Sequence, residues 1–125
     1  MSAWRQKAID CAPEFKKEFE QPETSIYDVF MDLRSVLVDA HRTNNVDRLR
    51  KIYDFAEWCF GQNTSDLWNA AGVSFYEHLA DSEETLKAMP RWVKQDIYRK
   101  IRGLLQFRIS DEKMKGLDNL YGIKE

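Results

Sequence analysis

The chain has 125 residues, of which 43% are hydrophobic, 13% aromatic and 32% charged, which fits one domain with its own core and excludes an intrinsically disordered chain. Five glycines and three prolines are about half the usual share, which excludes collagen-like, low-complexity and turn-rich β architectures. Nineteen basic and 21 acidic residues give a formal net charge of −2, whereas a dedicated nucleic-acid binder is usually basic.

Hydrophobic periodicity predicts helices throughout the chain and no strand. In the first half we expect a short helix at 3–11, another turn or two at 14–19, a helix from a cap at Thr24 or Ser25 to about His41, and a helix from a cap at Asn44 or Asn45 to near Gly61. In the second half we expect a helix from Ser65 to about Leu79, a short connecting helix from Ser82, a helix from Pro90 to about Phe107, and a short helix around 112–121.

The connections between these helices are short, so sequential helices should pack antiparallel. We therefore expect one all-α domain over residues 1–125, a bundle of about five to six mostly antiparallel helices.

Cysteine usage and the N-terminus indicate a soluble cytoplasmic protein. Cys11 and Cys59 form no CxxC motif and are expected to be reduced, partly buried thiols. The N-terminal residues lack the apolar core of a signal peptide, and the longest uncharged apolar-rich run, 67–76, is too short to span a bilayer. No membrane partner is expected.

The sequence contains no phosphate-binding glycine loop, no GxSxG or HExxH motif and no EF-hand spacing. We therefore predict no catalytic residue, no metal site and no cofactor. His78 is the residue that leaves an alternative open, because the helical wheel places it inside an apolar arc, where a buried imidazole needs a hydrogen-bond partner. A carboxylate from another helix would satisfy it structurally; alternatively Asn69, Glu77 and His78 line a pocket for a small ligand or an enzyme active site.

Acidic residues form a stripe along the helix expected from Thr24 or Ser25 to about His41. Asp28, Asp32 and Asp39 lie on one line of the helix, within a segment, 14–39, that has seven acidic and three basic residues. The stripe is either a solvated face or a docking surface for a basic protein partner.

Trp58 and Trp92 fall among charged residues on their helical wheels. Either the terminal segments of the chain cover them, or they are exposed anchors for a partner.

A basic segment, 91–108, contains six basic residues and one acidic residue, Asp96. Its charges do not form one tight stripe, so nucleic-acid binding is the third hypothesis, and a charged helix surface paired partly with acidic residues explains the segment better.

The segment Trp68–Leu79 reads Asn-Ala followed by Val-Ser-Phe and then Glu and Leu. With the helix that follows Met89-Pro90, over roughly residues 68–107, it resembles a helix pair of small bacterial all-helical domains that are mostly uncharacterised and include immunity-type members. Trp68, Gly72 and Phe75 also match the first-helix spacing of a tetratricopeptide repeat, but the second-helix positions do not follow. The resemblance implies helix packing in a small interaction domain and supplies no catalytic residue. The leading hypothesis is thus a non-enzymatic protein-interaction domain, an immunity or accessory protein that binds a bacterial partner.

Overall fold

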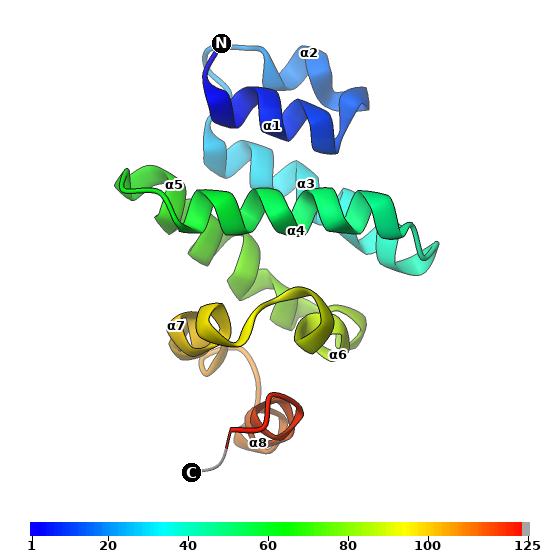
Figure 1. Ribbon diagram of the computed structural model, residues 1–125, viewed down its shortest axis with the longest axis vertical. Helices are drawn as coiled ribbons and strands as arrows, with labels where there is room; N and C mark the ends of the chain where they lie inside the picture. The colour runs from blue at the N-terminus through cyan, green and yellow to red at the C-terminus, as the bar shows by residue number, and fades with distance from the viewer. Residues whose placement is uncertain (124–125) are drawn as a thin grey trace. The chain divides into compact units, whose positions relative to one another are not determined.

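A computed structural model describes residues 1–123, and this part of the chain contains eight α-helices and no strand (Figure 1). The all-α prediction is confirmed. The predicted count of five to six helices is wrong, because short segments expected as single turns or connections form helices of their own. The backbone divides into two compact units, unit 1 (residues 1–75) and unit 2 (from Tyr76 onward), and each is described by itself. One domain over 1–125 stays a prediction.

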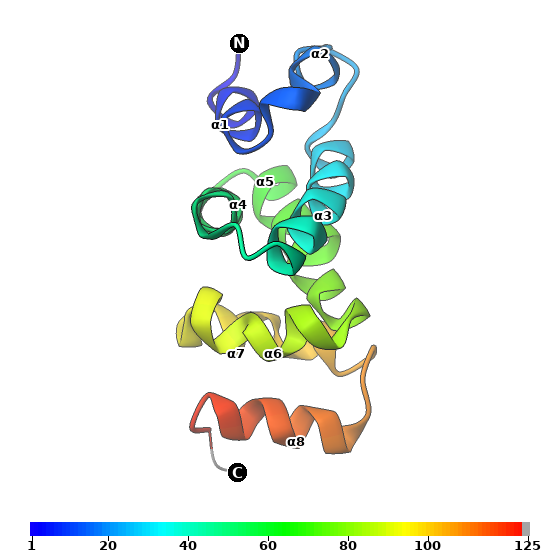
Figure 2. The same ribbon diagram turned by 90° about the vertical axis from the view of Figure 1, so that its right-hand side faces the viewer.

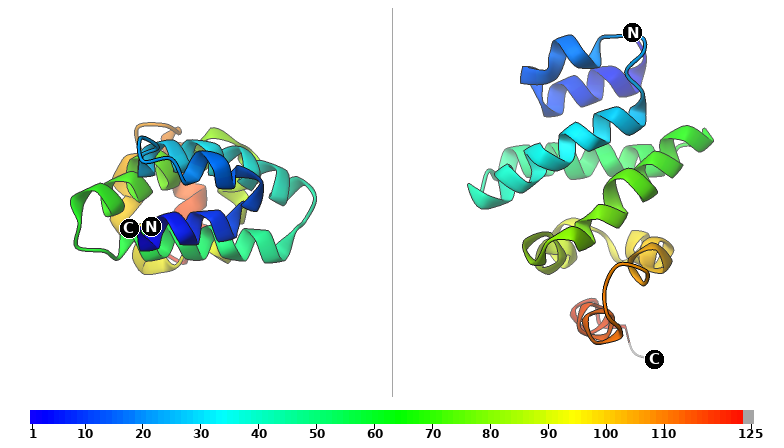
Figure 3. Two further views of the ribbon diagram at one scale, coloured as in Figure 1. Left: turned by 90° about the horizontal axis from the view of Figure 1, so that it is seen from above. Right: turned by 180° about the vertical axis from the view of Figure 1, so that it is seen from behind.

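Unit 1 is built around two long helices, α3 and α4, with α1 beside α4. Its elements are α1 (Ala3–Cys11), a 3₁₀ turn η1 (Pro13–Phe15), α2 (Lys16–Phe19), α3 (Ile26–Arg42), α4 (Val46–Phe60), α5 (Ser65–Ala70) and a π-helical turn η2 (Ala71–Phe75). Figure 2 shows α4 almost end-on, with α1 and α3 next to it. The view from behind in Figure 3 shows α3, in cyan, running along α4.

The predicted caps form at both long helices. The Ser25 hydroxyl accepts a hydrogen bond from the Asp28 amide at 3.2 Å, and the Asn45 side chain accepts one from the Arg48 amide at 3.2 Å. Each bond satisfies an amide that the first helical turn leaves unpaired. The aromatic core then fixes the two helices: the Phe30 ring centroid lies 5.4 Å from that of Phe55 and 5.6 Å from that of Phe75.

Unit 2 begins in a 3₁₀ segment and continues through three helices. Its elements are η3 (Tyr76–Asp81), α6 (Glu83–Trp92), α7 (Gln95–Leu105) and α8 (Asp111–Leu120). Pro90, expected to open a helix, lies instead in the last turn of α6, and α7 begins at Gln95. Pro90 has no backbone N–H to donate to the Leu86 carbonyl oxygen, and the helix ends two residues later, where Val93 is extended.

The helix expected from Ser65 to Leu79 is not continuous. The chain passes from α5 into the π-helical turn η2 and then into the 3₁₀ segment η3. A π turn holds more residues than an α turn and a 3₁₀ turn holds fewer, so positions beyond Ala70 no longer follow the α-helical wheel. This change of winding moves His78 away from the apolar arc predicted for it.

A buried hydrogen-bond network joins α7 to α8. The Tyr98 hydroxyl donates to Asp118 Oδ1 at 2.5 Å, and Arg102 donates to the same carboxylate through Nε at 2.9 Å and Nη2 at 2.5 Å. The bidentate guanidinium contact holds the pKa of Asp118 below its ordinary value. Over residues 1–123, no helix combines the length and the apolar content that crossing a bilayer requires.

Candidate functional site

The predicted acidic stripe lies on the solvent side of α3. Asp28 and Asp39 are exposed and Asp32 is half-buried. Asp28 also has a structural role, because its carboxylate accepts a hydrogen bond from the Ser25 amide at 3.0 Å and completes a capping box. The Ser-x-x-Asp spacing is the sequence signal for that role. The side chains of Asp32 and Asp39 form no hydrogen bond or ion pair within residues 1–123.

Carboxylates from two elements share one electrostatic surface at Asp32. Burial raises the pKa of the Asp32 carboxyl above its ordinary value, and the neighbouring charges of Asp28 and of Glu18 in α2 raise it further. We call Glu18, Asp28 and Asp32 the acidic face. Asp39 lies two turns farther along α3.

Trp58 lines a cavity of about 450 Å³ between α1 and α4. The other lining residues are Lys7, Asp10, Cys11, Lys51, Asp54 and Phe55. Lys7 Nζ lies over the Trp58 ring, 5.0 Å from its centroid, so the N-terminal helix covers one face of the indole. No residue of α3 lines this cavity, and Trp58 and the acidic face are therefore not brought together in it.

The two thiols of unit 1 are buried and unpaired with each other. Cys11 Sγ donates to the Lys51 carbonyl oxygen at 3.3 Å. Burial raises the pKa of Cys11 to about 12 and that of Cys59 to about 12, so neither thiol supplies a thiolate nucleophile near neutral pH.

The other tryptophans differ in exposure. Trp92 is half-buried, and the guanidinium carbon of Arg91 lies 5.0 Å from its ring centroid. Trp68, which the sequence did not single out as an anchor, is 45% exposed. Nothing in its spacing indicates this, because exposure depends on which side of the short helix α5 meets its neighbours.

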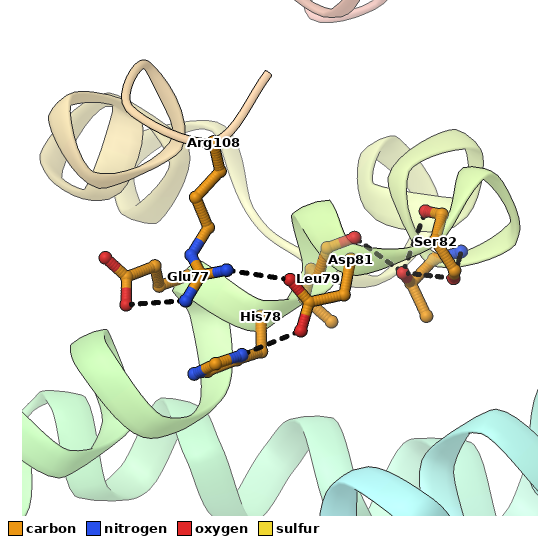
Figure 4. Close-up of polar contacts among 7 residues, drawn as sticks. Glu77, His78, Leu79, Asp81, Ser82 and Arg108 are labelled. Atoms are coloured by element: carbon orange, nitrogen blue, oxygen red, sulfur yellow. Dashed lines mark hydrogen bonds and ion pairs between the residues drawn. The ribbon is translucent and has the colours of Figure 1, made fainter.

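His78 lies in a cluster of charged side chains along η3 (Figure 4). Its Nδ1 is 2.7 Å from Asp81 Oδ2, and the Arg108 guanidinium lies 3.0 Å from the other Asp81 oxygen and 3.6 Å from Glu77 Oε2. The expected partner on another helix is wrong: the carboxylate comes from the same segment, three residues on, and the imidazole side chain is 22% exposed rather than buried. The arrangement orients the ring and fastens the turn that follows α7 to η3 through Arg108.

The three pocket candidates belong to different units. Asn69, in unit 1, donates through Nδ2 to the Tyr27 hydroxyl at 2.9 Å and so ties α5 to α3. Glu77 and His78 are in unit 2, where Arg108 and Asp81 are their partners.

The basic segment 91–108 is partly neutralised within unit 2. Arg102 pairs with Asp118, and Arg108 pairs with Glu77 and Asp81. Arg99 and Lys100 remain exposed on α7. In residues 1–123, no three histidine, cysteine, aspartate or glutamate side chains are grouped so as to hold a metal ion.

A family model described as a domain of unknown function, DUF7674, matches residues 5–108, which covers most of the chain and extends over both units. Comparison with curated proteins and with solved structures finds no match.

Proposed function

We propose that this chain, which belongs to the DUF7674 family of unknown function, is a non-enzymatic protein-interaction domain that binds a basic protein partner. The observation that carries the proposal is the acidic face, where Glu18, Asp28 and Asp32 place like charges together on α2 and α3. Like charges held close together are unfavourable in the free protein, and a basic partner relieves that repulsion.

Charge on the acidic face acts mainly on association. The raised pKa of Asp32 reflects partial burial and the repulsion of Asp28 and Glu18. An opposite charge on a partner reduces that repulsion and steers the encounter at long range. Asp39, exposed on the same helix, extends the attractive field along α3.

In its finer form, the proposal is that of an immunity or accessory protein that neutralises a bacterial partner by covering its functional surface. Such a protein needs a surface complementary to the partner and no chemistry of its own. The acidic face is a surface of that kind. A small-ligand site around His78 and nucleic-acid binding through 91–108 stay predictions of lower rank.

The test measures association of a fluorescently labelled lysine-rich peptide by stopped flow, over a series of salt concentrations. Asp32→Lys should slow association by about three- to tenfold at low salt, and the difference should fade in about 1 M salt, where charges are screened over a few ångströms. The matched control is Asp54→Lys, which makes the same change of charge at an exposed position on α4. If the two variants slow association equally, only net charge matters and the acidic face has no special role. If neither the native chain nor a variant binds the peptide at low salt, the proposal is wrong.

A further inference from the structure

A second cavity in unit 1 has the chemistry of a receptor for a cationic side chain. It measures about 350 Å³ and lies where α1, the start of α3 and the start of α5 meet. Its walls are two aromatic rings, two aliphatic side chains, two hydroxyls and one carboxylate, contributed by Trp4, Tyr27, Ile26, Leu67, Ser25, Thr64 and Asp66. Aromatic faces combined with a carboxylate are the groups by which proteins hold ammonium ions.

We propose that this cavity, the Trp4–Tyr27–Asp66 pocket, takes a lysine side chain of the basic partner. The inference rests on the proposed function and names the contact that would follow the electrostatic encounter. The aliphatic stem of lysine fits the apolar walls, and its ammonium fits the aromatic faces and the carboxylate.

The carboxylate of the pocket is unengaged. Asp66 is exposed and forms no hydrogen bond or ion pair within residues 1–123. Tyr27, by contrast, is held in place, because its hydroxyl accepts the hydrogen bond from Asn69 at 2.9 Å. One wall of the pocket is thus fixed by packing between α3 and α5, and the charged group is free to meet a guest.

The cation beside Trp4 belongs to the fold and does not fill the pocket. The Arg5 guanidinium carbon lies 4.5 Å from the Trp4 ring centroid, and Arg5 is not among the lining residues. Its guanidinium donates to four backbone carbonyl oxygens, at 2.7–3.1 Å, those of Phe19, Gln21, Pro22 and Thr24. Arg5 therefore fastens the segment between α2 and α3 and covers one face of Trp4.

Charge around the pocket favours a cation over an anion. The α3 N-terminus, which otherwise attracts anions, is compensated by the Asp28 carboxylate bonded to the Ser25 amide. Among residues 1–123, Asp66 is the one carboxylate that lines the pocket, and Arg5, whose guanidinium donates to backbone carbonyl oxygens, does not line it. A phosphate guest would face the Asp66 carboxylate.

The experiment titrates the ¹⁵N-labelled chain with N-acetyl-lysine methylamide and with N-acetyl-norleucine methylamide, which lacks only the ammonium group. The Trp4 indole N–H signal, assigned with Trp4→Phe, should shift with the lysine compound, which should bind about five- to tenfold more tightly than the norleucine compound. Asp66→Asn should abolish that preference. Asp54→Asn, an exposed acid outside the pocket, should preserve it. Tyr27→Phe keeps the ring and should retain binding.

Three results would overturn the inference. Equal binding of the norleucine compound would make the site simply apolar. A Trp4 shift with inorganic phosphate in place of lysine would make it an anion site, and an unchanged preference in Asp66→Asn would remove the carboxylate from recognition. None of these results bears on the acidic face, because Asp32 does not line the pocket and its own charge-reversal experiment tests the proposed function separately.

Discussion

Asp118 is the buried acid of unit 2, and its protonation is coupled to folding. Tyr98 and Arg102 both donate to its carboxylate, and the pKa of Asp118 is lowered first by the Arg102 hydrogen bonds. A group whose pKa is lower when folded adds stability at pH values above its unfolded pKa, about 3.9 for aspartate, and loses that contribution as the pH falls through the folded pKa. The pKa of Tyr98 is shifted upward, because burial and the Asp118 carboxylate both favour the protonated hydroxyl.

We expect Asp118→Asn to lower the free energy of unfolding by about 1–3 kcal/mol at pH 7, since it removes the carboxylate that accepts hydrogen bonds from Tyr98 and from the half-buried Arg102. Urea unfolding at a series of pH values measures the effect. The difference between the native chain and the variant should shrink as the pH falls below about 4. A difference that stays constant down to pH 2 would show that packing, and not ionisation, carries the contribution.

Trp58 combines packing with exposure, and both can be measured. Its ring lines the cavity between α1 and α4 and carries Lys7 over one face. We expect Trp58→Ala to lower the free energy of unfolding by about 1–2 kcal/mol, less than for a core tryptophan. Trp58→Phe, which keeps an aromatic face for Lys7, is the control in thermal melting. A loss of several kcal/mol would identify Trp58 as a core residue and end its candidacy as a partner anchor.

At the scale of helices, prediction succeeds where local signals agree. The helices α3 and α4 were predicted from a cap followed by apolar residues at three- and four-residue spacing, and both begin directly after Ser25 and Asn45. The segment after Ser65 carries a similar pattern but changes its winding at Ala71. That change of winding depends on how the segment packs against other helices, and the hydrophobic periodicity of one sequence does not reveal such packing.

The candidate site divides in the same way. Charge patterning along α3 is visible in the sequence, because aspartates four and seven residues apart share a helix face. The Trp4–Tyr27–Asp66 pocket is not, since its walls come from α1, α3 and α5 and meet only in the fold. For His78, the helical wheel was applied beyond the residue where the α-helix ends. The wheel therefore placed His78 in an apolar arc and did not indicate its local partner, Asp81.

Two glycines lie inside helices of unit 2 with open space around them. A Cβ added at Gly103 in α7 or at Gly116 in α8 would meet no atom within 4 Å. Because glycine costs helix stability through backbone entropy, Gly103→Ala and Gly116→Ala should each raise the free energy of unfolding by about 0.5–1 kcal/mol. Chemical denaturation measures this. Gly122, with a φ of +72°, supplies the opposite control, and Gly122→Ala should destabilise the chain by about 1 kcal/mol.

Charge is distributed unequally over the whole chain. Residues 1–75 contain nine basic and twelve acidic residues, and the chain from Tyr76 onward contains ten basic and nine acidic residues. The acidic excess of unit 1 fits a basic partner, whereas basic and acidic residues nearly balance in unit 2, where Arg102 and Arg108 form ion pairs. By its net charge, unit 1 therefore attracts a basic partner more strongly than unit 2 does.

Nucleic-acid binding is the hypothesis that this distribution disfavours, and it can be tested directly. In fluorescence anisotropy with a short random-sequence DNA duplex we expect a dissociation constant weaker than about 10⁻⁴ M at physiological salt, the weak limit of non-specific binding. The reason is that binding to the phosphates of DNA requires several exposed cationic side chains, and α7 offers only two in the described residues, Arg99 and Lys100. Tighter binding that falls steeply with salt, and that Arg99→Glu with Lys100→Glu removes, would establish α7 as a nucleic-acid surface. The matched double variant Lys16→Glu with Lys17→Glu, on α2 in unit 1, makes the same change of charge and should leave any such binding in place.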